Sequence, residues 1–157
     1  MKTANRTALN IFKTSSPAGT LKLAARLARK LSGGEVLFLR GPIGAGKTVL
    51  VQGLAKALGM TGRPTSASFN LMREYRSAKA RLFHIDLFRL SESDIANLGL
   101  EEILEDDNAI IAAEWPDPAA LLLPQDRLEI DIALTEGDGR EISLRATGPR
   151  SEALLDI

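Results

Sequence analysis

The fold is decided by the stretch EVLFLRGPIGAGKT, residues 35–48. Its first half is an apolar run of strand length, and its second half is a glycine-rich turn that leads into a helical pattern of apolar residues. The turn matches G-x-x-x-x-G-K-[ST], the pattern of a phosphate-binding loop, and it stands between a strand and a helix as such a loop requires. The stretch therefore predicts a nucleotide site, with a decayed loop that binds nothing as the alternative.

Each residue type in this loop has a mechanical reason. Glycines allow the backbone to curl until successive N–H groups point at phosphate oxygens, in front of the positive end of the following helix. Lys47 can reach the β- and γ-phosphates, and the Thr48 hydroxyl can bind Mg²⁺. The ATP-binding residues predicted in this loop are Gly41, Gly44, Ala45, Gly46, Lys47, Thr48 and Val49.

The composition is that of an ordinary globular protein. The chain has 157 residues, of which 45% are apolar and 25% charged, so we expect one P-loop domain, residues 1–157, with a sizeable core. No cysteine is present, which excludes disulfides and thiolate metal sites. The N-terminus lacks the apolar core of a signal peptide, and no apolar run approaches the roughly 18 residues of a membrane span. We therefore expect a cytoplasmic protein without membrane contact.

The formal net charge is zero, but the two signs are separated along the chain. Residues 1–90 contain 16 Lys and Arg against 3 Asp and Glu, whereas residues 91–141 contain 2 against 15. One interpretation is that the two segments neutralise each other within one fold. The other is a bipolar surface, with a basic side for phosphates or RNA and an acidic side for a protein partner.

The periodicity of the N-terminal part predicts a strand, a helix and a second strand. Residues 7–13 alternate weakly and are expected to form an edge strand. A helix is expected to begin at Pro17, with Ser16 as its N-cap, and to end at Gly33. Residues 36–39 are apolar throughout and predict a central parallel strand that is buried on both faces.

Beyond the phosphate loop, the pattern predicts a helix that ends at Gly59 and then a series of strands and short helices. Gly53 inside the helix costs about 1 kcal/mol relative to Ala unless it permits close packing on the sheet. Residues 59–68 have turn chemistry and are expected to form a loop. The other expected elements are a hairpin of strands 69–76 and 80–88, helices at 91–94 and 100–104, a buried strand at 109–113 and a terminal hairpin of strands 128–134 and 142–146. We therefore expect an α/β fold, a three-layer domain of the P-loop NTPase type with a mixed central sheet and a C-terminal β-hairpin.

A nucleoside triphosphate site also needs groups that hold Mg²⁺ and orient the attacking water. In an open α/β sheet these groups lie at the carboxyl ends of the strands. Glu114 ends one apolar strand and Asp86 ends another. We therefore predict Glu114 and Asp86 as catalytic residues, and with Thr48 as metal ligands. A solvated strand-end carboxylate is the alternative interpretation of Glu114.

Further candidates lie near these acids in the sequence. His84 shares a strand face with Asp86, because side chains alternate along a strand. Since Mg²⁺ prefers oxygen ligands, we expect His84 to support its neighbours, with a purely structural role as the alternative. Ser66 and Ser68 lie where switch segments sense the γ-phosphate in other nucleotide-binding proteins, and an ordinary turn is the alternative. Trp115, the sole tryptophan, is expected to contact the nucleotide, with packing or partner contact as alternatives.

The order of these motifs resembles one family. GPIGAGKT, SASFNLMREY, HIDLFRL, LGLEEIL and AAEWP follow one another as in the bacterial TsaE (YjeE) ATPases, which take part in making the threonylcarbamoyladenosine modification of tRNA. The resemblance covers about residues 20–116. It implies a slow Mg²⁺-dependent ATPase that serves the TsaB and TsaD proteins and meets tRNA through their complex.

The resemblance also implies roles for single residues. Lys47 and Thr48 match the phosphate and metal residues of the family. Asp86 matches the acid of the H-x-D block, and Glu114 with Trp115 matches the family's acid–tryptophan pair.

Three departures from the family pattern stand out. Where the family has Ser-Pro-Thr-Phe, this chain has SASF at residues 66–69, so the hydroxyls remain but the stiffening proline is absent. Phe88 replaces a tyrosine, and Val49 replaces a second threonine in the loop. These changes put fine control of the switch loop in doubt and leave the proposed chemistry intact.

Two other classes of function remain open. A small-molecule kinase of P-loop type would need an arginine-bearing lid over its acceptor, and Arg89 is the single arginine between Asp86 and Glu114. A nucleotide-dependent interaction module without hydrolysis is the other class, and a phosphate-release assay separates it from an ATPase.

Overall fold

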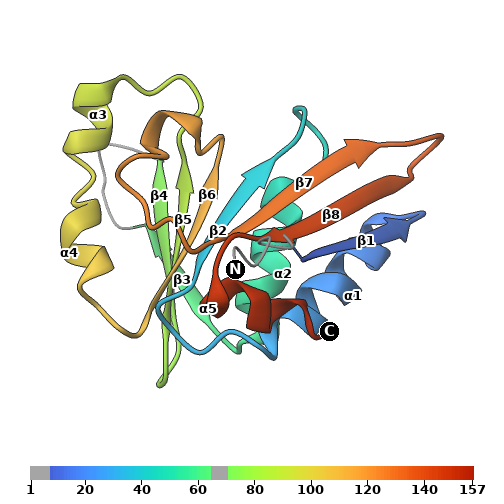
Figure 1. Ribbon diagram of the computed structural model, residues 1–157, viewed down its shortest axis with the longest axis horizontal. Coiled ribbons are helices and arrows are strands. Elements are labelled where there is room, and N and C mark those ends of the chain that lie inside the picture. The colour runs from blue at the N-terminus through green and yellow to red at the C-terminus, as the bar shows by residue number, and fades with distance from the viewer. Residues whose placement is uncertain (1–7, 65–70) are drawn as a thin grey trace, which may run out of the picture.

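A computed structural model describes residues 8–64 and 71–157 of the chain (Figure 1). The elements in chain order are β1 (Leu9–Thr14), α1 (Pro17–Ala28), β2 (Val36–Arg40), α2 (Lys47–Ala57), β3 (Thr61–Pro64), β4 (Met72–Arg76), β5 (Arg81–Asp86), α3 (Glu92–Ala96), α4 (Leu100–Leu104), β6 (Ala109–Glu114), the 3₁₀ turn η1 (Asp117–Ala119), β7 (Leu128–Leu134), β8 (Arg140–Ala146), α5 (Pro149–Glu152) and the 3₁₀ turn η2 (Ala153–Leu155). The described residues form one sheet of eight strands in the order β1-β8-β7-β2-β6-β5-β4-β3.

The centre of the sheet is parallel and its edges are antiparallel. β2 runs parallel to both β6 and β7, and β5 runs parallel to β6. The hairpins β4–β5 and β7–β8 are antiparallel, as are the pairs β1–β8 and β3–β4. The predicted mixed sheet, the buried parallel strand β2 and both hairpins are therefore confirmed.

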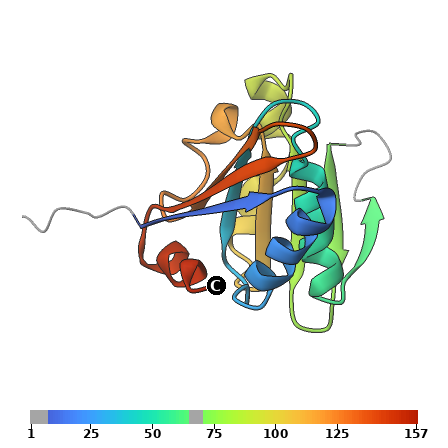
Figure 2. The ribbon, with the colours of Figure 1, turned by 90° about the vertical axis from the view of Figure 1, so that its right-hand side faces the viewer.

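Helices cover both faces of the sheet (Figure 1, Figure 2). On one face, α1 and α2 pack side by side, and Leu27 and Leu54 meet sheet residues such as Leu39 in one apolar cluster. On the other face, α3 and α4 cover a second cluster that contains Ile95 and Phe38. Because side chains alternate along a strand, β2 contributes to both clusters. No helix in the described ranges is long and apolar enough to cross a membrane.

The first helix ends earlier than predicted. α1 begins at Pro17, as expected, but it ends at Ala28 rather than at Gly33. The buried Glu35 carboxylate explains the difference, because it accepts hydrogen bonds from the backbone N–H groups of Ser32 and Gly33 at 3.0 and 2.8 Å. These bonds stabilise a non-helical turn in front of β2.

Part of the predicted loop 59–68 is a strand, so that prediction was wrong for Thr61–Pro64. These residues form β3, which pairs antiparallel with β4 at the edge of the sheet. Their sequence, TGRP, has no alternation of apolar and polar residues, and hydrogen bonds to β4 set their conformation instead. The neighbouring strand begins at Met72, and the predicted start at Phe69 lies outside the described residues.

Gly53 allows two helices to approach each other. A Cβ atom at Gly53 would lie 2.9 Å from Cβ of Ala24 and 3.0 Å from Cδ2 of Leu21, both on α1. Gly53 does permit close packing, as expected, but it packs against helix α1 and not against the sheet, so that part of the expectation was wrong. The C-terminal elements α5 and η2 were not predicted, and Leu154 and Leu155 anchor them in the same apolar cluster as α1 and α2.

Candidate functional site

The phosphate loop leads from the end of β2 to the start of α2. Gly41, Gly44 and Gly46 have φ angles of 143°, 81° and 102°, a region that residues with side chains rarely adopt. A Cβ atom at Gly41 would also lie 2.5 Å from the carbonyl oxygen of Ile132 on β7. The pattern of glycines is therefore required by the path of the backbone.

Arg140, from the C-terminal hairpin, braces this loop. Its Nε donates a hydrogen bond to the carbonyl of Ala45 at 2.9 Å, and its Nη2 donates to the carbonyl of Gly44 at 3.2 Å. In a trans peptide the N–H points away from the C=O. Holding the Ala45 carbonyl toward Arg140 therefore turns the N–H of Gly46 the opposite way, as a phosphate cradle needs. The N–H of Ala45 instead donates to the carbonyl of Pro42 at 3.1 Å, which closes a turn within the loop.

A cavity of about 420 Å³ lies against the loop at the carboxyl ends of the parallel strands. Its walls bring together the predicted residues Gly44, Gly46, Lys47, Thr48, Val49, Asp86, Glu114 and Trp115, and they add Ile43 and Phe88. Gly41 and Ala45 belong to the loop but do not line the cavity. Ser66 and Ser68 lie outside the described residues, so their predicted role stays a prediction.

Glu114 is the centre of the hydrogen bonds in the cavity. The Thr48 hydroxyl donates to Oε1 of Glu114 at 2.6 Å, and Nε2 of His84 lies 2.8 Å from the same oxygen. No described residue forms a hydrogen bond with Oε2. Burial by itself favours the neutral acid, but the hydrogen bonds from His84 and Thr48 and the nearby charge of Lys47 bring the pKa of Glu114 below its ordinary value. Glu114 is therefore a carboxylate at neutral pH.

Asp86 lies beside Glu114 because of the strand register. The two acids are paired positions at the ends of the parallel strands β5 and β6. One oxygen of Asp86, Oδ1, accepts a hydrogen bond from the backbone N–H of Phe88 at 3.0 Å, which turns the chain sharply after β5. Two carboxylates from neighbouring strands thus border one cavity.

Lys47 is held inside the loop. Its Nζ donates hydrogen bonds to the carbonyl oxygens of Gly41 at 2.6 Å and Pro42 at 3.0 Å, and it lies 4.2 Å from the ring centre of Trp115. Burial lowers the pKa of Lys47, and the nearby charges of Glu114 and Asp86 partly oppose this shift. The lysine charge is therefore placed between the loop and the two acids.

Trp115 has a backbone conformation that is uncommon outside glycine, with φ of 53°. Its N–H donates to the carbonyl of Leu39 at 3.2 Å, which ties the turn after β6 to β2. The Trp115 ring is 4.9 Å from the ring of Phe88 and faces Lys47. Strained backbone of this kind is concentrated at functional sites, and here it turns an aromatic ring toward the cavity.

The donor set suits a magnesium ion that is bound together with phosphates. No group of three or more His, Asp and Glu side chains among the described residues could hold a metal ion alone. Mg²⁺ does not need such a group beside a nucleotide, because one or two carboxylates, phosphate oxygens and water complete its shell. The oxygens of Thr48, Glu114 and Asp86 fit this requirement.

Sequence reasoning missed two features of the site. Arg140 lies far from the loop in the chain, and only the fold of the terminal hairpin brings it to the loop. The bond between His84 and Glu114 was not predicted as a pair, although His84 was expected to support a neighbour. Alternation along β5 was the available signal, but it does not say which strand lies alongside.

Comparisons with known proteins agree with this geometry. A profile of the family described as threonylcarbamoyl adenosine biosynthesis protein TsaE matches residues 14–142. The tRNA threonylcarbamoyladenosine biosynthesis protein TsaE of Bacillus subtilis is 35% identical over 145 residues, 92% of this chain and 90% of that protein. The protein of the same name from Nostoc is 38% identical over 122 residues, 76% of this chain and 74% of that protein. The crystal structure of Bacillus subtilis YdiB matches with a TM-score of 0.79 and 32% identity, over 96% of this chain and 94% of that one.

The profile match extends across the phosphate loop, both strand-end acids and Trp115, so the similarity includes the whole cavity. The B. subtilis protein matches over nearly the full length of both chains. The chain therefore belongs to the TsaE family, which acts in the biosynthesis of threonylcarbamoyladenosine in tRNA.

Proposed function

We propose that this protein is an Mg²⁺-dependent ATPase that acts with the TsaB and TsaD proteins to form the threonylcarbamoyl modification of adenosine in tRNA. One observation supports the ATPase most directly. Thr48 and His84 both bind Oε1 of Glu114, at the edge of a cavity formed by a phosphate loop. None of the described residues forms a hydrogen bond with the other carboxylate oxygen, Oε2, and we assign that oxygen to a water molecule or a cation.

In the proposed reaction, water attacks the γ-phosphorus of ATP, the bond to the β–γ bridging oxygen breaks, and ADP and phosphate leave. The N–H groups of the loop and the Lys47 ammonium bind the phosphates and stabilise their charge. Glu114 orients the attacking water, and the proton lost by that water ends on the released phosphate. Mg²⁺, held by Thr48, Glu114 and Asp86, would supply positive charge to the phosphates.

The partnership with TsaB and TsaD is proposed from membership of the family. We expect the chain to meet tRNA through that complex. An ATPase that drives an assembly through its cycle is expected to turn over slowly alone and faster with its partners.

The test is phosphate release from ATP by the purified protein, with and without TsaB and TsaD. Glu114→Gln and Asp86→Asn should keep nucleotide binding but lower the rate by about ten- to several-hundredfold, because each removes one positioned charged group. Lys47→Ala should instead lose ATP binding. Asp131→Asn, on strand β7 and outside the cavity lining, is the matched control and should behave as wild type. Wild-type rates in both acid variants would contradict the assignment.

The same assay separates the other classes of function. A kinase would release ADP without phosphate, and only when an acceptor is supplied. An interaction module would bind nucleotide and release neither product.

A further inference from the structure

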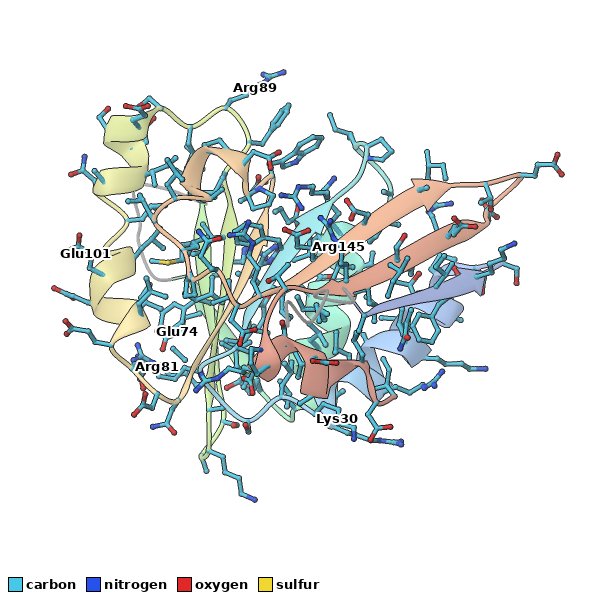
Figure 3. All side chains as sticks on the ribbon, in the orientation of Figure 1. Lys30, Glu74, Arg81, Arg89, Glu101 and Arg145 are labelled. Carbon is cyan, nitrogen blue, oxygen red and sulfur yellow. The ribbon has the colours of Figure 1, made fainter. Side chains whose placement is uncertain are left out.

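The charges that are separated along the sequence are only partly neutralised by the fold. Ion pairs join the basic and acidic segments where Arg40 meets Asp117 and where Arg81 meets Asp106. Within the described ranges, no Lys or Arg forms an ion pair with five exposed acids on α3, α4 and the turn after α4: Glu92, Glu101, Glu102, Glu105 and Asp107. Figure 3 shows Glu101 projecting outward from α4.

An apolar groove of about 310 Å³ lies beside these acids. Ile95, Leu100, Leu104 and Leu122 provide its apolar wall, and Glu101 and Glu102 stand at its edge. None of these residues lines the nucleotide cavity, so the groove is a separate feature of the surface.

Two adjacent leucines extend the apolar surface out of the groove. Leu121 is 94% exposed and Leu122 is 55% exposed, whereas the next residue, Leu123, is 3% exposed and belongs to the core under α3 and α4. Anchoring by Leu123 fixes the segment and keeps its two neighbours in contact with water. Apolar side chains held in water beside an apolar groove favour cover by another molecule.

The negative charge around the groove indicates which kind of molecule can bind there. Unpaired carboxylates repel the phosphates of RNA and of anionic lipid surfaces, and they attract Lys and Arg. We propose that the surface formed by the groove, Leu121 and Leu122 docks a segment of a partner protein that presents apolar side chains flanked by Lys or Arg. The apolar contacts hold the segment, and the acids speed its arrival and fix its orientation.

The existence of this docking surface does not depend on the proposed function. The identity of its partner does rest on the proposed function, because TsaB and TsaD are the partners proposed there. A second copy of this chain is a competing occupant. In that case the docked segment would be α1 of the second copy, whose exposed face carries Leu21 next to Lys22, with Arg26 one turn further on.

The test measures binding of the full chain to two immobilised probes, the TsaB–TsaD complex and a synthetic helix of Leu and Lys. A helix of Leu and Glu is the control for charge. Two double variants change the docking surface. One combines Leu121→Ser with Leu122→Ser, and the other combines Glu101→Lys with Glu102→Lys. Matched controls on the terminal hairpin are Leu134→Ser, at a leucine that is 50% exposed, and Glu136→Lys. ATP affinity and phosphate release are measured for each variant, and neither should change.

We expect both docking variants to bind TsaB–TsaD and the Leu–Lys helix at least tenfold more weakly than wild type, and both controls to bind as wild type. If wild type binds the Leu–Lys helix but not TsaB–TsaD, and the docking variants lose binding to the helix, the result would support the surface and refute the proposed partners. Equal binding by all variants, or no binding of either probe, would overturn the inference. Self-association in sedimentation that the docking substitutions abolish would also overturn it, in favour of a second copy.

Discussion

Nε2 of His84 lies 2.8 Å from Oε1 of Glu114, the oxygen to which Thr48 also donates. Because the pKa of Glu114 is below its ordinary value, even though burial opposes this shift, the carboxylate is ionised at neutral pH and can only accept hydrogen bonds. His84 must therefore donate from Nε2. The sole histidine of the chain thus fixes the orientation of an acid that lines the cavity.

This pairing predicts that His84 acts on catalysis more than on binding. His84→Ala should lower kcat for ATP hydrolysis by about 10- to 100-fold, the usual cost of losing a residue that orients a metal or water ligand. ATP affinity, measured by calorimetry, should stay within about threefold, since His84 itself does not line the cavity. His84→Gln, which keeps a side-chain N–H donor, should recover part of the rate. An unchanged kcat in His84→Ala would show that Glu114 does not need this support.

The brace on the phosphate loop predicts a different kinetic result. Arg140→Ala frees the carbonyls of Gly44 and Ala45, so the loop must be ordered when nucleotide binds. We expect ATP affinity to fall about tenfold, which corresponds to about 1.4 kcal/mol. Arg145→Ala is the control on the same strand, because Arg145 pairs with Glu129 and does not touch the loop. Equal affinities of the two variants by calorimetry would contradict the role of Arg140.

The features of the fold that sequence predicts are those with local causes. The apolar run before the loop, the clean alternation of the terminal hairpin and the start of α1 at Ser16 and Pro17 all depend on a few adjacent residues. A short helix was also predicted to open at residues 91–94, and α3 does begin there, with a reciprocal capping box between Ser91 and Asp94 that was not predicted. β3 could not be predicted, because its conformation depends on pairing with β4 and its own sequence carries no strand pattern.

The same distinction applies to the site. Glu114 and Asp86 could be chosen from sequence because each ends an apolar strand, and the register of β5 and β6 then places them side by side. Arg140 carried no local signal, since its partners Gly44 and Ala45 are 96 and 95 residues away. Contacts of this kind follow from the order of strands in the sheet, which periodicity alone does not determine.

Asp126 predicts how stability depends on pH. Its carboxylate accepts hydrogen bonds from the backbone N–H groups of Arg150 at 2.8 Å and Ser151 at 2.9 Å, at the start of α5. Burial alone would raise the pKa of Asp126, but the hydrogen bonds from Ser151 and Arg150 bring it below its ordinary value. The lowered pKa means that this stabilisation is complete above the unfolded pKa of about 3.9 and is lost as pH falls through the folded pKa.

We therefore expect Asp126→Asn to lower the free energy of unfolding by about 1 kcal/mol at pH 7, the scale of a charge-assisted cap. The difference from wild type should shrink below about pH 4, where the wild-type carboxyl also becomes neutral. Urea unfolding at several pH values measures both quantities. Asp138→Asn, in the exposed turn between β7 and β8, is the control and should match wild type. If the difference in unfolding free energy between wild type and Asp126→Asn grows toward low pH, the lowered pKa assigned to Asp126 is wrong.

Trp115 provides a built-in reporter of nucleotide binding. Its ring lies 4.2 Å from Nζ of Lys47 and 4.9 Å from the ring of Phe88, and the chain has no other tryptophan. Phosphates in the cavity should draw the Lys47 ammonium away from the ring, which removes a nearby positive charge and changes the emission of Trp115. We expect a saturable change on addition of ATP or ADP with Mg²⁺, and the dissociation constant should equal that from calorimetry.

Two variants identify the source of this signal. Phe88→Leu should shift the emission of the free protein and keep the response to nucleotide, because the Lys47 contact remains. Lys47→Ala should remove the response at nucleotide concentrations that saturate wild type, since it removes both the ammonium and the phosphate contact. If calorimetry shows saturation of wild type while the emission of Trp115 stays constant, then nucleotide does not disturb the contact between Lys47 and Trp115, and the proposed movement of the lysine is wrong.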